Sequence, residues 1–137
     1  MKRKEAKIMN LSDETNVTND ELTYSKTSPK GGAYGYVRNS RRRPDSITED
    51  VNYITQWCRI NEWLLATVFT DVAVSSNRRE RPGFTALCDV LRLHSDHVVI
   101  VVSWAHLSRN RTLREYFSQE IQATGAQLIV LNDCATN

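Results

Sequence analysis

The sequence predicts an α/β fold: an open, mostly parallel four-stranded sheet with helices packed on it, preceded by a flexible N-terminal tail. From residue 33 onward, short runs rich in β-branched residues alternate with segments of helical periodicity, which is the order of a parallel sheet. The run from His97 to Ser103 is continuously apolar at its centre, as is typical of a strand covered on both faces. A chain of 137 residues, 40% of them hydrophobic, is long enough for one domain with a core.

Residues 1–32 form the predicted tail. This segment is polar, Tyr24 is its only aromatic residue, and it holds all five lysines of the chain. Such a composition buries too little apolar surface to offset the entropy of ordering the chain. No apolar stretch follows the basic start, and no apolar run approaches the roughly 18 residues of a membrane span. We therefore expect neither a secretory signal nor a membrane partner.

The first strand and helix follow the tail directly. A strand is expected from Ala33 to Val37, and a helix from about residue 47 to 61. The segment Ser46–Glu49 has the form of a capping box, in which the serine and the glutamate satisfy backbone donors at the start of a helix. The apolar positions that recur at helical spacing after it are Ile47, Val51, Ile54 and Cys58.

The middle of the chain predicts a strand, a helix and a strand. The second strand runs from Trp63 to Asp71, and the third from His97 to Ser103. Pro82 suits the first turn of the helix between them, because its missing N–H costs nothing there. The inner face of this helix is expected at Phe84, Leu87 and Leu91.

The last helix and strand complete the sheet. A second capping box, Thr112–Glu115, starts the helix, and Gly125 is expected as its C-cap. One side of this helix carries Leu113, Phe117 and Ile121. The fourth strand is predicted from Ala126 to Leu131.

The cysteines do not indicate a disulfide framework or a metal site. The three are far apart and odd in number, and nothing near them completes the ligand spacing of zinc. Cys58 and Cys88 are interpreted as buried thiols, with a reactive thiol as the alternative.

The arginines are distributed unevenly, which the formal net charge of +2 conceals. After Lys30 the chain contains 12 arginines and no lysine. Ten of these 12 arginines lie in or beside the loops that follow the first three strands. In a parallel sheet these loops open at one edge, where ligands bind. That edge suits a polyanion held through its phosphates, although a solvated basic edge and a compositional bias of the genome are alternatives. The ten are Arg38, Arg41, Arg42, Arg43, Arg78, Arg79, Arg81, Arg109, Arg111 and Arg114.

Ser40 stands among these arginines and is a candidate nucleophile. A serine hydroxyl can attack a phosphodiester if guanidiniums, such as those of Arg38 and Arg109, stabilise the charge of the pentacovalent transition state. By itself, a lone serine in a loop is more often a cap or a turn residue.

Several motifs, in order along the chain, resemble those of the serine recombinases, the resolvase/invertase family. Gly35–Ser40 resembles the first signature, G-Y-x-R-x-S. Asp71–Ser75 followed by Arg81–Phe84 resembles D-x-x-x-S followed by R-P-G and a hydrophobic residue. Val101–Asn110 resembles the strand and loop that usually end in L-D-R-L-S-R-N. The match extends from about Ala33 to Asp133.

The resemblance implies a function and a set of site residues. Ser40 would attack DNA to give a 5′-phosphoserine link and a free 3′-hydroxyl, and strands would be exchanged in a tetramer and rejoined with neither a metal nor a cofactor. Arg38, Arg81 and Arg109 would bind the phosphate and stabilise the transition state. The supporting residues would be Tyr36, Asp71, Ser75 and His106. The DNA-binding residues would be Arg41, Arg42, Arg43, Arg78, Arg79 and Arg111.

The resemblance also implies partners and a location. The partners would be DNA and either a second copy of the chain or a full-length serine recombinase. The location would be the cytoplasm, where a protein of bacterial or phage type would associate with the nucleoid. Residues 33–137 would be the catalytic domain, without the long dimerisation helix and the C-terminal DNA-binding region of family members.

Four positions depart from the family pattern. Ala105 and His106 stand where the family has an aspartate and an arginine, Asp50 replaces a glutamine, and Ser76 replaces a glycine. An alanine side chain can neither orient an arginine nor transfer a proton. The alternative function is therefore a catalytically degenerate relative that acts as an accessory protein and binds DNA or a recombinase.

Overall fold

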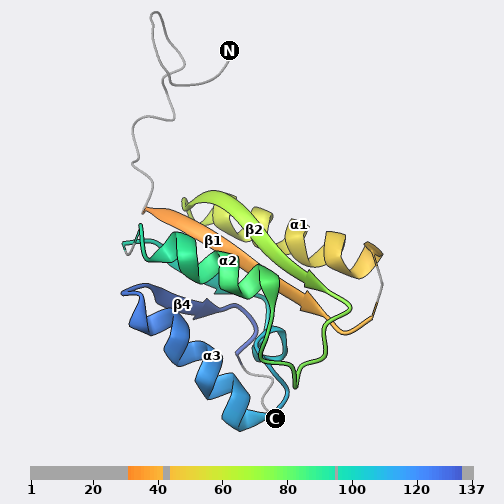
Figure 1. Cartoon of the computed structure of the whole chain (residues 1–137). Helices are drawn as coiled ribbons and strands as arrows, with labels where there is room; N and C mark the ends of the chain where they lie inside the picture. Colours follow the sequence, from red (N-terminus) through yellow and green to blue (C-terminus); the bar gives the residue numbers. More distant parts are fainter. Residues whose placement is uncertain (1–30, 42–43, 95, 134–137) are drawn as a thin grey trace, which may run out of the picture.

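The computed structural model describes residues 31–41, 44–94 and 96–133. Four parallel strands form one sheet in the order β2-β1-β3-β4 (Figure 1). The strands are β1 (Gly32–Asn39), β2 (Leu64–Val72), β3 (Val98–Val101) and β4 (Gln127–Val130). The predicted parallel sheet is therefore confirmed, while residues 1–30 of the expected tail lie outside the described part of the chain.

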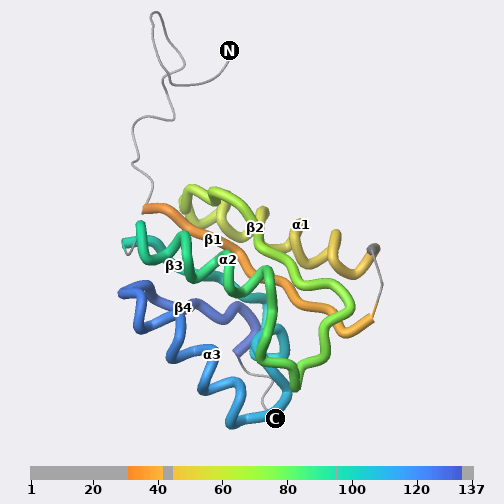
Figure 2. Tube along the Cα trace, in the orientation of Figure 1, coloured from red at the N-terminus to blue at the C-terminus, as the bar shows by residue number. Residues whose placement is uncertain are grey.

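Three helices cover the two faces of this sheet. They are α1 (Pro44–Ile60), α2 (Pro82–Leu91) and α3 (Arg111–Ala123), and a short 3₁₀ helix, η2 (Trp104–His106), follows β3. Helix α1 lies on one face, and α2 and α3 lie side by side on the other, as the chain trace in Figure 2 shows. Within the described residues, no helix has both the length and the apolar character that crossing a membrane requires.

The core consists of two clusters, one on each face of the sheet. On the face of α2 and α3, Phe84 and Phe117 pack against β1 and β3. On the face of α1, Ile54 and Cys58 pack against the other side of the same two strands. All four residues of β3 are buried, as the continuous apolar run predicted. Burial also raises the pKa of the Cys88 thiol to about 11, which agrees with an unreactive core cysteine.

Both predicted capping boxes are wrong in position. Helix α1 begins at Pro44, so Ser46 lies inside its first turn and not before it. Helix α3 begins at Arg111, and its N-cap is Asn110, whose side-chain oxygen accepts from the Leu113 N–H at 3.1 Å. Asn110 precedes Thr112 and offers a better cap, because asparagine is among the strongest N-cap residues. At the other end, Gly125 follows the C-cap Thr124 and has the left-handed φ of 95° that ends many helices.

The carboxyl end of β1 has a strand neighbour on one side only. β1 pairs with β2 along its whole length, with Arg38 opposite Asp71. Its pairing with β3 extends only from Ala33 to Gly35 within the described strands. The main chain around Arg38 therefore needs other partners on the β3 side.

Asp71, at the end of β2, holds the first turn of α2. The N-cap residue of α2, Arg81, makes no side-chain cap. The buried Asp71 carboxylate accepts instead from the N–H groups of Gly83 at 2.7 Å and Phe84 at 2.9 Å. A carboxylate in this place satisfies two unpaired donors and interacts favourably with the positive end of the helix dipole. The position of α2 is thus fixed by the strand that precedes it.

Gly83 allows this close approach of α2 to β2. A Cβ atom added at Gly83 would lie 2.4 Å from the carbonyl oxygen of Thr70 and 2.9 Å from the Asp71 carboxylate. Neither oxygen has room to withdraw without moving the strand or breaking the cap. The glycine of the R-P-G sequence at the start of this helix is therefore explained by the lack of space for a side chain.

We expect Gly83→Ala to lower the free energy of unfolding by about 1–3 kcal/mol, because the added methyl group must separate α2 from β2. Urea denaturation measures the loss. Thr85→Ala, an exposed change two residues along the same helix, is the control and should stay within about 0.5 kcal/mol of the original chain. Equal urea midpoints for Gly83→Ala and the original chain would show that α2 does not pack this closely.

Candidate active site

Ser40 lies one residue beyond β1, in an exposed turn whose first residue, Asn39, makes two hydrogen bonds. The carbonyl oxygen of Asn39 accepts from the Val74 N–H at 3.0 Å, which ties the end of β1 to the loop after β2. The Asn39 side-chain oxygen accepts from the Arg41 N–H at 2.8 Å, forming an Asx turn around Ser40. The predicted nucleophile is therefore accessible and is presented by an ordered turn.

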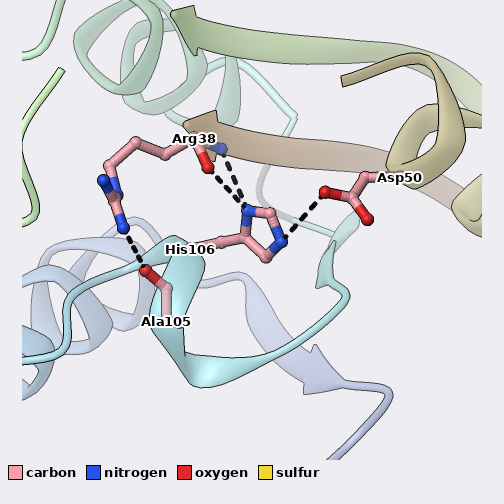
Figure 3. A network of polar contacts seen from close by, with 4 residues as sticks. All are labelled: Arg38, Asp50, Ala105 and His106. Atoms are coloured by element: carbon pink, nitrogen blue, oxygen red, sulfur yellow. Dashed lines mark hydrogen bonds and ion pairs between the residues drawn. The ribbon is translucent and has the colours of Figure 1, made fainter. Parts of the chain in front are cut away.

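Arg38, two residues earlier, is buried, with 6% of its surface exposed. Its guanidinium donates to the carbonyl oxygens of Val74 at 2.8 Å and Ala105 at 2.7 Å. Burial, then the positive charge of Arg81, lowers the pKa of Arg38. The Nε atom is buried and has no hydrogen-bond partner in the described part of the chain. The alanine side chain at position 105 offers no group to orient an arginine, but the Ala105 main-chain carbonyl accepts from Arg38 and does so (Figure 3).

His106 is packed between β1 and α1, as Figure 3 shows. Its Nδ1 atom lies 3.0 Å from the main-chain nitrogen of Arg38, and its Nε2 atom lies 3.4 Å from a carboxylate oxygen of Asp50. Burial lowers the pKa of His106 below its ordinary value, and the opposing effect of Asp50 does not outweigh it. Only 11% of the His106 side chain is exposed. The imidazole is therefore largely shielded from solvent and contacts the Arg38 main chain.

Arg81 is more deeply buried than Arg38, at 1% exposure. Its Nε donates to the Arg78 carbonyl at 2.8 Å, and its two amino nitrogens donate to the carbonyls of Ser76 at 3.0 Å and His106 at 3.3 Å. The guanidinium also stacks on the ring of Phe117, with its carbon 3.9 Å from the ring centroid. Arg81 therefore joins the loop after β2 to the loop after β3.

Tyr36 completes this buried network. Its hydroxyl donates to the Asp71 carboxylate at 2.7 Å and lies 3.5 Å from an amino nitrogen of Arg81. Burial, and then the Asp71 hydrogen bond, raise the pKa of Tyr36, so the phenol stays protonated. Tyr36 and Asp71, both predicted as supporting residues, are thus brought together beneath the loops.

Two serines lie in the same loops. Ser75 is exposed, and its hydroxyl accepts from the Asn77 N–H at 3.1 Å, as a turn residue does. Ser108, which the sequence did not single out, is fully buried. It donates to the Ser76 carbonyl at 2.8 Å and accepts from the Asn110 N–H at 3.0 Å. The sequence offered one signal for this role, which is that Ser108 stands between the apolar Leu107 and Arg109. That signal is weak, because residue type does not show whether a serine in a loop is buried.

Several exposed basic side chains lie at the carboxyl edge of the sheet, in the loops or at the start of α3. Arg79 lies over the ring of Tyr116 at 4.5 Å, and Arg111 pairs with Glu115 at 3.5 Å. Two of the predicted DNA-binding residues, Arg42 and Arg43, lie outside the described residues. The exposed predicted residues are Arg41, Arg78, Arg79, Arg109 and Arg111. The edge that carries Ser40 is therefore cationic and accessible.

Comparison with solved structures finds this fold in catalytic domains of known recombinases. The catalytic domain of the ISC1926 TnpA, an IS607-like serine recombinase, has a TM-score of 0.68 and 21% identity, covering 77% of this chain and 71% of that one. The N-terminal catalytic domain of TP901-1 integrase has a TM-score of 0.66 and 24% identity, covering 74% and 77%. A resolvase-family site-specific recombinase from Streptococcus pneumoniae has a TM-score of 0.63 and 17% identity, covering 79% and 78%.

These identities are low and show the fold alone. No curated relative matches the chain in sequence. The family model of the resolvase N-terminal domain, however, matches residues 33–137, which is most of the chain. The chain therefore belongs to the resolvase family, and its described residues have the fold of a serine-recombinase catalytic domain.

Proposed function

We propose that residues 33–137 catalyse DNA strand exchange with Ser40 as the nucleophile. One observation carries this proposal: Ser40 is exposed in an ordered turn at the carboxyl end of the central strand β1, within a cationic edge. In open α/β sheets this edge is where ligands bind. A serine at an edge that carries several exposed arginines fits a phosphodiester better than a neutral substrate.

The proposed reaction is a transesterification. The Ser40 Oγ atom forms a bond to phosphorus, and the bond from phosphorus to the 3′-oxygen breaks. The proton lost by the serine is balanced by the one that the 3′-oxygen gains as it becomes a free hydroxyl. One phosphodiester replaces another, so the reverse attack by a 3′-hydroxyl rejoins the strands without an external energy source.

The three predicted catalytic arginines differ in exposure, which suggests different roles. Arg109 is exposed and therefore accessible to a phosphate. Arg38 is buried but has an Nε donor without a partner in the described residues. Arg81 is occupied by main-chain carbonyls, so we assign it a positioning role that holds the loops on either side of Ser40. Charge stabilisation of the pentacovalent phosphorus then falls mainly to Arg109 and Arg38.

The exposed arginines would hold DNA through its phosphates. Exchange of strands requires more than one catalytic serine, so the partners that follow are DNA and either a second copy of this chain or a full-length serine recombinase. The proposed location is the cytoplasm, where a protein of bacterial or phage type would associate with the nucleoid.

A second candidate function is that of an accessory protein that binds DNA or a recombinase without cleaving DNA. The observation that favours it is the position of His106, whose ring is bonded to the Arg38 main chain and cannot take the place of a phosphate-binding arginine. Ala105→Asp combined with His106→Arg tests this candidate. If the original chain forms no covalent DNA adduct and the double variant does, the accessory function is supported. An adduct with the original chain would exclude it.

We expect the chain to form a covalent adduct with duplex DNA that carries a recombination crossover site, and Ser40→Ala to abolish it. Denaturing gel electrophoresis of end-labelled DNA measures the adduct and shows which strand end is linked to protein. Ser118→Ala, on α3, is the control and should form the adduct normally. A persistent adduct in Ser40→Ala would show that another residue is the nucleophile.

The arginines should separate into two classes. Arg109→Ala should lower the rate of adduct formation about 10²-fold and change the free energy of unfolding by less than about 0.5 kcal/mol. Arg81→Leu should lower the free energy of unfolding by more than about 3 kcal/mol, because three main-chain carbonyl groups lose their buried donor. Urea denaturation and adduct kinetics measure both effects, with the exposed Arg92→Ala as the control. If the Arg81→Leu protein is stable and fails only in adduct formation, the positioning role is wrong and Arg81 binds the phosphate directly.

A further inference from the structure

The imidazole of His106 occupies the place that a neighbouring strand would have beside Arg38. β1 loses its β3 partner after Gly35, while both main-chain polar groups of Arg38 face the loop after β3. The Nδ1 atom of His106 lies 3.0 Å from the nitrogen and 3.1 Å from the oxygen of Arg38. A single ring nitrogen therefore stands opposite one donor and one acceptor.

This nitrogen can serve only one of the two groups in each protonation state. In the neutral ring with the proton on Nε2, Nδ1 accepts from the Arg38 N–H and Nε2–H points at Asp50, 3.4 Å away. In the charged ring, Nδ1 carries a proton, so it can donate to the Arg38 carbonyl but leaves the Arg38 N–H facing a donor. Protonation thus exchanges one main-chain hydrogen bond for another at the end of β1.

The charges around the ring favour the neutral form. Arg38 approaches from β1 and Arg109 from the loop before α3, and both lower the pKa of His106. The Arg81 guanidinium, at the start of α2, binds the main-chain oxygen of the same histidine. Asp50, from α1, and the hydrogen bond to the Arg38 main chain favour the charged ring, but burial outweighs them. The resting state is therefore a neutral imidazole that accepts from the Arg38 N–H.

We propose that Asp50 and His106 are positioning residues that hold the Arg38 main chain, and with it the Ser40 turn, in the reactive conformation only while the imidazole is neutral. The link to Ser40 is short: Asn39 joins Arg38 to the serine, and its own carbonyl and side chain fix the turn. The inference rests on the proposed function of Ser40. It assigns a purpose to the two residues that depart from the family pattern at positions 50 and 106.

The consequence for stability has a definite sign. The pKa of His106 in the folded chain lies below its value of about 6.5 in the unfolded chain, so the unfolded chain binds this proton first. The stabilisation from the neutral ring is therefore complete above about pH 6.5 and is lost as the pH falls through the lower, folded pKa.

Nuclear magnetic resonance of the ¹⁵N-labelled full chain tests the inference without DNA. Between about pH 8 and pH 5, the Arg38 amide and the His106 ring nitrogens should shift together, with a midpoint below about 6.5. His106→Asn keeps an acceptor near the position of Nδ1 but cannot titrate, so its Arg38 amide should not shift. Asp50→Asn should move the midpoint lower, and His94→Asn, which removes an exposed imidazole, should leave it unchanged.

The spectra also define the results that would overturn the inference. A proton on Nδ1 at neutral pH would contradict the assigned hydrogen bond. A pH-dependent Arg38 amide in His106→Asn would assign the effect to another group.

Adduct formation with crossover-site DNA gives the functional readout. In the original chain the rate should fall tenfold per pH unit below the His106 pKa, as expected when one protonation inactivates the site. His106→Asn should keep its rate through that interval, whereas His106→Leu should be slow at every pH. A rate in His106→Asn that falls with acid as in the original chain would overturn the inference. If no adduct forms at any pH, the proposed function fails, and the Arg38 resonance still decides whether the histidine controls this main chain.

Discussion

The arrangement of the site depends on one buried positive charge, the guanidinium of Arg81. Burying a charge is costly unless its donors are all matched, and here the matching oxygens come from the loops after β2 and β3. The Phe117 ring on α3 covers its face, and the Tyr36 hydroxyl stands beside it on β1. Satisfying this single group therefore brings two loops, two helices and the central strand into one fixed geometry.

This constraint divides the arginines by function. In Arg81 all three guanidinium nitrogens donate to main-chain carbonyls, so it is a rigid structural centre. Arg109 is on the surface and available to a ligand, and Arg38 keeps one nitrogen without a partner among the described residues. The sequence presents Arg81 and Arg109 in the same way, each in a loop after a strand and each within a recognisable motif. Only the fold shows that Arg81 is enclosed by main chain and that Arg109 is exposed. A basic motif in a loop thus identifies the neighbourhood of a site more reliably than it assigns a role to each arginine.

The fold was more predictable than the site, for a physical reason. The buried strand β3 and the inner face of α2 follow from hydrophobic periodicity, which is a local property. The helix starts were misplaced because a capping box matches several positions, and the choice of Asn110 depends on the geometry of the preceding loop. Burial of Ser108 and the role of the Ala105 carbonyl depend on loops that meet only in the folded chain. Side-chain identity carries no information about such main-chain contacts.

Replacing a carboxylate by a main-chain carbonyl has an electrostatic consequence at Arg38. An aspartate at position 105 would orient the guanidinium and neutralise much of its charge. The Ala105 and Val74 carbonyls orient it through hydrogen bonds of 2.7 and 2.8 Å while contributing only dipoles. His106 adds no positive charge while it is neutral, and the Asp50 carboxylate lies on the far side of that ring. The charge of Arg38 therefore remains available to an anion near Ser40, so the loss of an acid at position 105 need not remove the electrostatic stabilisation that phosphoryl transfer requires.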